Sequence, residues 1–160
     1  MRAPEFIAYS NGIRSRTDRL VPLIPPDRFE WRPADGAFSF GDILRHLAGI
    51  ERWMWAENAA GRPARYPGHD AAVAGADPAA YFAALRAESS DIFDNLTDAD
   101  LESKVATPAG AEMKLWKWLR AMLEHEAHHR GQLYLMLRMI GIATPPLFGL
   151  TSEQVHDRCP

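Results

Sequence analysis

The sequence predicts an all-α protein, specifically a four-helix bundle with long crossover connections. Three observations lead to this prediction. Apolar residues recur at helical spacing in four segments, helix-capping residues precede several of them, and no segment has the alternating pattern of a convincing β-strand. Two of the intervening segments are long, which indicates at least one crossover. With 160 residues and no internal repeat, residues 1–160 are expected to form a single domain with a substantial core.

The composition is that of an ordinary soluble globular protein, with 47% hydrophobic and 24% charged residues. The net charge is −3 and the 18 Lys and Arg residues are scattered, which argues against a nucleic-acid partner. No apolar run is long enough to span a membrane, and the N-terminus lacks the pattern of a secretory signal. The single cysteine, Cys159, precludes an intrachain disulfide. We therefore expect a cytoplasmic protein that acts on a small molecule.

The first helix is expected from Pro4 to about Leu23, because apolar residues recur there at roughly helical spacing and proline suits an opening turn. Pro22 and the pair at 25–26 are expected to stop it. Residues 27–38 then read as an ordered loop.

The second helix is expected to begin after Ser39, with Asp42 three positions later as a variant of the capping box. It is expected to fade near Gly61, where Gly and Pro follow one another. Its apolar stripe comprises Ile43, His46, Leu47, Ile50, Trp53 and Met54. His46 therefore faces the core rather than water.

The third helix is expected to start at Asp77, with Pro78 in the first helical position, and to run through Leu96. Residues 97–112 form a connector that holds either a short turn or a hairpin-like extended piece. The fourth helix is expected over 114–140 and ends at Gly141. A final capping box, Thr151 to Gln154, predicts a short terminal helix.

The fourth helix carries the most informative stretch, His-Glu-Ala-His-His-Arg-Gly-Gln at 125–132. His125 and His129 are four residues apart and project from one face of the helix. Two imidazoles in an apolar setting need partners for their ring nitrogens, which hydrogen bonds within the core or a metal ion can supply. With His46 on the apolar face of another helix, a three-histidine metal site is the favoured interpretation. Three neutral imidazoles suit zinc, nickel or iron and leave coordination positions open.

The remaining histidines have other interpretations. His128 lies towards the polar side of the helix, as a supporting or surface residue that pairs with Glu124 or, alternatively, replaces His125 as a ligand. His69 is in a loop, where it is either solvated or reaches the mouth of the site.

Two other metal sites compete for the same residues. The stretch 125–129 satisfies H-E-x-x-H, in which Glu126 would be the general base of a zinc peptidase. The extended pattern of one peptidase group is missing, since position 132 is Gln and 135 is Leu. The other group takes a downstream Glu as third ligand, for which Glu153 is the only candidate. No predicted strand offers an edge for a peptide substrate. A di-iron bundle needs a second Glu-x-x-His, which the His46 helix lacks.

Two motifs together are similar to those of a known family. His46 within the segment 39–51 and the pattern His125-x-x-x-His129-Arg-Gly-Gln132 resemble the DinB/YfiT-like superfamily of metalloenzymes, as does the tail from Gly141 through Pro145-Pro146-Leu to Gly149-Leu-Thr. The resemblance covers essentially the whole chain. It implies a four-helix bundle, often a homodimer, with a divalent metal held by the residues at 46, 125 and 129.

The resemblance also implies a class of activity. Relatives include transferases and isomerases that use low-molecular-weight thiols such as mycothiol or bacillithiol, so we expect a thiol-dependent S-transferase or isomerase, or a hydrolase. A thiol co-substrate is part of this expectation. The alternative is a non-catalytic, metal-stabilised bundle with a binding or stress-related role. No catalytic residue is assigned from the sequence. Residues expected to support the site are His128, Arg130 and Gln132, and those expected to line a pocket, or to be plain core, are Trp53, Trp118 and Met122.

Overall fold

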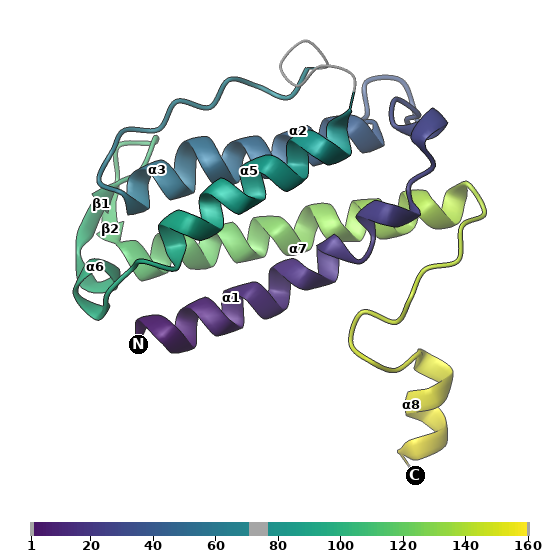
Figure 1. The fold of residues 1–160 in the computed structure, drawn as a ribbon. Coiled ribbons are helices and arrows are strands. Elements are labelled where there is room, and N and C mark those ends of the chain that lie inside the picture. Colours follow the sequence, from purple (N-terminus) through teal and green to yellow (C-terminus); the bar gives the residue numbers. More distant parts are fainter. Residues whose placement is uncertain (1, 71–76, 160) are drawn as a thin grey trace.

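Four long helices form the body of the protein in the computed structural model, which describes residues 2–70 and 77–159 (Figure 1). These helices are α1 (Ala3–Asp18), α2 (Phe40–Ile50), α5 (Pro78–Phe93) and α7 (Leu115–Met139). A π-helical turn, η3 (Glu51–Trp55), and a last short turn, α3 (Ala56–Ala59), extend α2 without a break. The prediction of an all-α four-helix bundle is confirmed.

The helices α2 and α5 run in the same direction, opposite to α1 and α7 (Figure 1). Two consecutive helices can be parallel only if the chain between them returns along the bundle. Residues 60–70 follow that path beside α2 (Figure 1). The expected crossover is therefore present, and it carries a loop along the outer side of α2.

The first helix is shorter than expected, because α1 ends at Asp18 rather than near Leu23. An α-helix continued through Pro22 would lack one N–H donor and would place the proline ring against the carbonyl of residue 18. The chain instead forms two 3₁₀ turns, η1 (Val21–Leu23) and η2 (Pro26–Arg28). Pro22 thus ends the α-helix four residues before its own position, at Asp18.

The expected helix starts are confirmed at Ser39 and Asp77. The Ser39 hydroxyl accepts a hydrogen bond from the Asp42 N–H (3.0 Å), and the Asp42 carboxylate accepts one from the Ser39 N–H (2.9 Å). The Asp77 carboxylate accepts hydrogen bonds from two N–H groups in the first turn of α5. This helix ends at Phe93, three residues before the expected Leu96.

The connector contains a helical turn, α6 (Asp98–Glu102), and a hairpin of two strands, β1 (Lys104–Ala106) and β2 (Glu112–Lys114). The strands pair antiparallel with Val105 opposite Met113. Both expected alternatives, a short turn and a hairpin-like piece, therefore occur in the connector. The expectation of no strand is wrong. Strands of three residues are too short to show a periodic pattern.

The last long helix agrees with its expected bounds, and Gly141 terminates it with a φ of 81°. Beyond it the expected capping box is present at Thr151 and opens α8 (Ser152–Arg158). This short helix lies apart from the bundle (Figure 1), and all of its residues are exposed. No helix among the described residues has both the length and the apolar character needed to cross a membrane.

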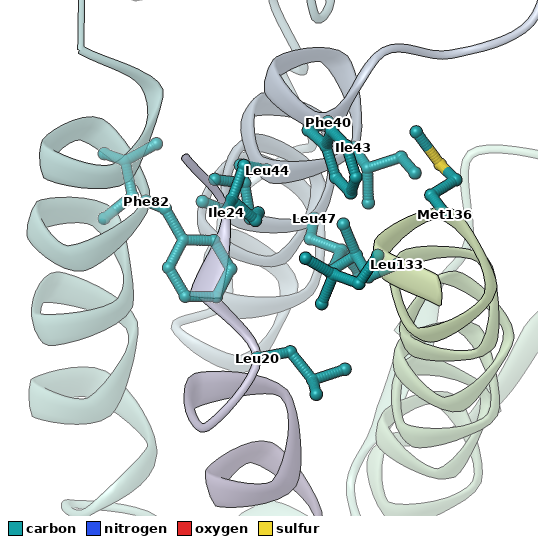
Figure 2. Packing of buried hydrophobic residues seen from close by; sticks show 12 residues of the cluster. Leu20, Ile24, Phe40, Ile43, Leu44, Leu47, Phe82, Leu133 and Met136 are labelled. Carbon is teal, nitrogen blue, oxygen red and sulfur yellow. The ribbon is translucent and has the colours of Figure 1, made fainter. Parts of the chain in front are cut away.

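Apolar side chains form two clusters, one towards each end of the bundle. The first is built on α2 and α7 with contributions from α5 and the turn after α1, and Figure 2 shows its interlocking side chains. Its buried members include Leu20, Ile24, Phe40, Ile43, Leu44, Leu47, Phe82, Leu133 and Met136. The second joins α1 to α7 near the hairpin. Complete burial of each large apolar side chain contributes about 1.5–3 kcal/mol.

A polar layer separates the two clusters along every helix. Its buried members include Arg14 and Thr17 on α1, Glu51 after α2, Arg86 and Ser89 on α5, and Glu126, His129 and Arg130 on α7. Buried polar groups are costly unless they are paired. The middle of the bundle is therefore where ion pairs, hydrogen bonds or ligands must be found.

Candidate metal centre

His46 of α2 and His125 and His129 of α7 lie together in this polar layer. One ring nitrogen from each residue can be chosen so that all three lie within 4.8 Å of one another. The Nε2 atoms of His46 and His125 are 2.9 Å apart. The structure thus brings together the three histidines singled out in the sequence, although 79 positions (125 − 46) separate the first two.

The pair on α7 owes its geometry to helical spacing. Residues four apart lie on the same face, one turn above the other, and the rings of His125 and His129 have centroids 4.5 Å apart. The third ring comes from the opposing helix, with the His46 centroid 4.9 Å from that of His125 and 4.7 Å from that of His129. Two helices therefore converge on one cluster of imidazoles.

Hydrogen bonds orient two of the three rings. The Nδ1–H of His129 donates to Oε1 of Gln132 at 2.7 Å, which leaves Nε2 with a free lone pair. The Tyr66 hydroxyl lies 2.9 Å from Nδ1 of His46 and 3.5 Å from Nδ1 of His69. When Nδ1 of His46 carries its proton and donates to Tyr66, its Nε2 is likewise free.

The three rings are held in their neutral form. Desolvation, the largest cause, and the neighbouring histidines together lower the pKa of His46 to about 3. Desolvation also lowers the pKa of His125 to about 4. The pKa of His129 is lowered too, mainly by burial. All three imidazoles are therefore neutral near pH 7 and offer lone pairs rather than positive charge.

The crossover loop delivers Tyr66 and His69 to the cluster. Its backbone is attached to α2 through the Arg45 Nε–H, which donates to the carbonyl of His69 at 2.8 Å. Gly49 allows the loop to approach closely, since a Cβ there would meet the Tyr66 ring at 3.3 Å. The His69 ring lies 5.9 Å from that of His46 and 4.4 Å from that of Phe38. Of the two interpretations of His69, the structure supports the one in which it reaches the site.

The tryptophan beside the histidines is Trp55, not the expected Trp53. The Trp55 ring centroid is 5.2 Å from that of His125. The π-helical turn at Glu51–Trp55 contains one more residue per turn than an α-helix, so positions beyond it are rotated relative to the expected stripe. Trp53 instead has the guanidinium groups of Arg52 and Arg65 over its ring, at 4.2 and 4.3 Å from the ring centroid.

The other expected pocket residues take different places. Trp118 packs at a tilt against Trp55, with ring centroids 5.4 Å apart, and its indole N–H donates to Asn58 Oδ1 at 3.0 Å. Met122 is buried in the second apolar cluster and borders a small void with Phe6 on α1. Met122 is therefore a residue of the apolar core and does not line a pocket at the histidines.

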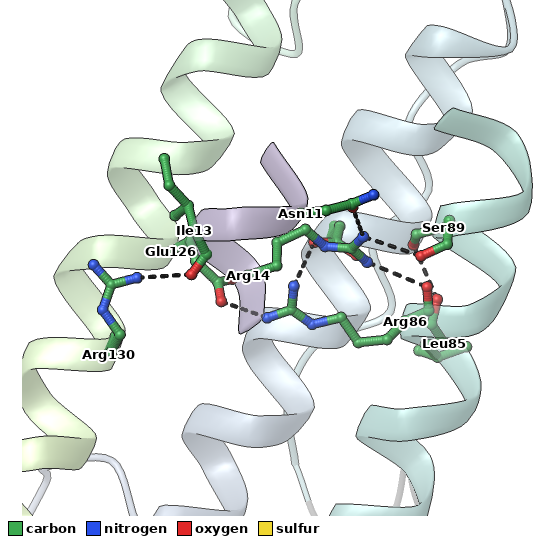
Figure 3. Close-up of polar contacts among 10 residues, drawn as sticks. Asn11, Ile13, Arg14, Leu85, Arg86, Ser89, Glu126 and Arg130 are labelled. Carbon is green, nitrogen blue, oxygen red and sulfur yellow. Dashed lines mark hydrogen bonds and ion pairs between the residues drawn. The ribbon is translucent and has the colours of Figure 1, made fainter. Parts of the chain in front are cut away.

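The three residues expected to support the site also differ in their contacts. Gln132 contacts His129 directly, as described above. His128 is exposed, and its Nε2 lies 3.4 Å from Nε2 of Gln132 rather than in a pair with Glu124. Arg130 is buried and donates to the carbonyl of Ile13 at 3.2 Å (Figure 3), which connects α7 to α1.

Glu126 belongs to a buried ion-pair network on another face of α7 (Figure 3). Its Oε1 accepts from Arg86 Nη2 at 2.5 Å, and Arg86 also pairs with Glu51 (3.2 Å), to which Arg14 donates two hydrogen bonds. A carboxylate engaged in this way does not serve as the general base of a zinc peptidase or as a di-iron ligand. The hairpin does provide two short strands, but the ion pair of Glu126 with Arg86 is what disfavours a peptidase.

The fold and the site together define an all-α bundle protein with a histidine cluster between two of its helices. The chain belongs to the DinB superfamily, whose family model matches residues 11–133. No curated protein sequence matches it.

Solved structures of DinB-like proteins share this architecture. The chain is similar to YjoA from Bacillus subtilis, with 19% identity, a TM-score of 0.74, and coverage of 89% of this chain and 95% of that one. A DinB-like protein from Bacillus cereus is 18% identical, with a TM-score of 0.71 and coverage of 91% of this chain and 97% of that one. YfiT from Bacillus subtilis is 16% identical, with a TM-score of 0.64 and coverage of 88% of this chain and 89% of that one. YfiT is described as a probable metal-dependent hydrolase with an unusual four-helix bundle topology. At these identities the likeness is one of fold.

Sequence reasoning missed Phe38, Tyr66 and Trp55 at this site. Phe38 and Tyr66 lie in loops, where no periodic pattern indicates which side chains turn inward. The position of Trp55 at the site could not be predicted without knowing that a π-helical turn ends at this residue. The one available signal was Gly49, a small residue inside a helix, which often marks the close approach of another segment.

Proposed function

We propose that His46, His125 and His129 bind one divalent metal ion and that the protein is a metal-dependent enzyme. The observation that carries this proposal is the convergence of three neutral imidazoles from two helices, with ring nitrogens within 4.8 Å of one another. Two of the rings have Nδ1 partners that leave Nε2 free to coordinate. Hydrogen bonds of this kind commonly orient histidine ligands.

The residues present fit such an ion. Metal–nitrogen bonds of about 2.0–2.1 Å in tetrahedral geometry place ligand nitrogens roughly 3.3 Å apart. That spacing lies between the 2.9 Å contact of the Nε2 atoms of His46 and His125 and the 4.8 Å limit for the whole set. Zinc, nickel and iron all accept three imidazoles. When bound, a divalent metal with an open position supplies a Lewis acid that lowers the pKa of water or a thiol towards neutrality.

The surrounding residues suit a small-molecule substrate. His46 and His125 remain partly exposed, whereas His129 is only 7% exposed, so the cluster is not completely buried. Phe38 and Trp55 form apolar walls next to the imidazoles, and Tyr66 is the polar group nearest to them from the crossover loop. This mixture of apolar walls and a few polar groups is typical of ligand sites.

The proposed reaction is either hydrolysis or a thiol-dependent transfer or isomerisation. Hydrolysis is favoured by the description of YfiT as a probable metal-dependent hydrolase. Thiol chemistry is favoured by the sequence resemblance described above, and it would require a low-molecular-weight thiol as co-substrate. A cytoplasmic location, expected from the sequence, and a homodimer, implied by the family resemblance, are further parts of the proposal.

The test begins with elemental analysis of protein purified without a histidine tag. We expect close to one divalent metal per chain, and loss of that metal in His125→Ala. The matched control is His128→Ala, which removes an exposed histidine three residues away and is expected to keep the metal. A wild-type protein with no metal affinity would contradict the proposal.

Activity is tested next, by conjugation assays with glutathione, mycothiol and bacillithiol and by hydrolysis of ester and amide substrates. We expect turnover with one class and its loss in His125→Ala. Full activity in the metal-free protein would refute the enzyme proposal. Metal binding without turnover in any assay would favour the non-catalytic bundle instead.

A further inference from the structure

The indole N–H of Trp55 is a buried hydrogen-bond donor with no acceptor among the described residues. The side chain is almost completely buried, with 4% of the residue exposed, so bulk water does not satisfy it. Leaving such a donor unpaired costs about 1–3 kcal/mol. Unpaired buried groups are rare in folded proteins, and each one calls for a specific explanation.

The neighbouring Trp118 shows that the same kind of group can be satisfied here. The two rings lie next to one another at a tilt of 42°, and the Trp118 N–H donates to Asn58 Oδ1 at 3.0 Å. The Trp55 ring also lies near His125, at 5.2 Å between centroids. The unpaired donor therefore belongs to the ring that lies near His125, and the paired donor belongs to the neighbouring Trp118 ring.

The backbone places Trp55 there by an unusual conformation. A uniform α-helix was expected to present Trp53, and the π-turn at Glu51–Trp55 presents Trp55 instead. Such turns are less stable than the regular helix and are frequent at functional sites. Glu51, at the start of the turn, is anchored in the buried ion pairs with Arg14 and Arg86, which holds the altered register in place.

We infer that the Trp55 indole N–H donates a hydrogen bond to an anionic acceptor, an oxyanion or a thiolate, of the small molecule that binds beside His125. This inference rests on the proposed function and names the chemical class that its site takes. A charged acceptor suits the position because the three imidazoles are neutral and a divalent metal held by them would leave the site with a positive charge. A fixed donor in a site shielded from water favours an anion without reorganising when the anion forms.

The test uses azide as the anion and cobalt(II) as the metal, since anion binding changes the visible absorption of cobalt. We expect Trp55→Phe, which keeps an aromatic ring but lacks the N–H, to bind cobalt as the wild type does. Azide affinity should fall roughly ten- to hundredfold, the range of one hydrogen bond to a charged group. Trp116→Phe, the same change at a partly exposed position on α7, is the matched control and should leave azide affinity unaltered.

The outcomes separate this inference from the proposal on which it rests. If the wild type binds no cobalt, the proposed function is wrong and the inference falls with it. If cobalt binds and Trp55→Phe has the azide affinity of the wild type, only the inference is wrong.

A second measurement applies to the wild-type protein, in case the variant does not fold or does not retain metal. In the zinc-loaded form, azide should move the Trp55 indole N–H proton resonance downfield, the change expected when a donor gains an acceptor. The Trp118 resonance should stay in place, because its donor is already paired. An unmoved Trp55 signal at saturating azide overturns the inference.

Discussion

Replacing Arg86 with methionine is expected to destabilise the bundle severely. Arg86 is 7% exposed and lies between two carboxylates that are themselves buried, Glu51 at 2% and Glu126 at 3% exposed. It contacts Glu51 Oε2 at 3.2 Å and Glu126 Oε1 at 2.5 Å. Glu51 would keep Arg14 as a partner, whereas Glu126 would lose the ion pair shown in Figure 3. Methionine fills much of the aliphatic stem, so the change acts mainly on charge.

The expected loss follows from the burial of Glu126. Removing one partner of a buried ion pair costs about 3–5 kcal/mol, because an uncompensated charge remains in the interior. Since domains unfold with about 5–15 kcal/mol, this is a large part of the total stability. For a chain of this length it corresponds to a fall in Tm of roughly 6–20 °C. Urea denaturation followed by circular dichroism measures the free energy, and a thermal scan measures Tm.

Two further variants test the cause. Arg120→Ala removes one partner of an ion pair whose side chains are 59% and 70% exposed, and should change stability by less than about 0.5 kcal/mol. Adding Glu126→Gln to Arg86→Met removes the stranded charge and should restore part of the loss. The reasoning is refuted if Arg86→Met costs less than about 1 kcal/mol, or if the double variant is no more stable than the single one.

Three other predictions concern the candidate metal centre. Glu126→Gln should leave the metal content unchanged by elemental analysis, because the carboxylate faces the ion-pair network; loss of metal would restore the H-E-x-x-H interpretation. Gln132→Leu should weaken metal affinity about 10- to 100-fold in a chelator competition, since it frees Nδ1 of His129; unchanged affinity would rule out this orienting role. The metal-free protein should lose stability as the pH falls from 7 towards 4 in urea titrations. His46 and His125 have pKa values of about 3 and 4 in the folded protein, below the 6.5 of an unperturbed histidine. Because the unfolded chain therefore binds protons at a higher pH than the folded one, acid favours unfolding. Equal free energies of unfolding at pH 7 and pH 5 would contradict this prediction.

The helices were predictable because their signals are local. The Ser39 capping box, Asp77 as N-cap and Gly141 as terminator each act within a few residues of their own positions. The errors have local causes too. Pro22 ended α1 one turn earlier than its position suggested. The hairpin strands of three residues were too short for a pattern to emerge.

The candidate site was predictable only in part. The spacing of His125 and His129 guarantees a shared helix face, and the apolar setting of His46 indicated that it points inward. The identity of the surrounding groups was not predictable. Tyr66 reaches His46 only because the crossover loop runs along α2, and Trp55 replaces Trp53 only because the helix widens after Glu51.

By itself, the sequence determined the four helices, their caps and the two imidazoles one turn apart on α7, because these properties depend on residues within one or two helical turns. Tertiary structure decided which distant groups meet. In the folded protein His46 contacts His125, Glu126 pairs with Arg86, and Tyr66 contacts His46. The physical reason is that such contacts depend on how the helices pack and on the path of the loops between them, neither of which any spacing along the chain specifies.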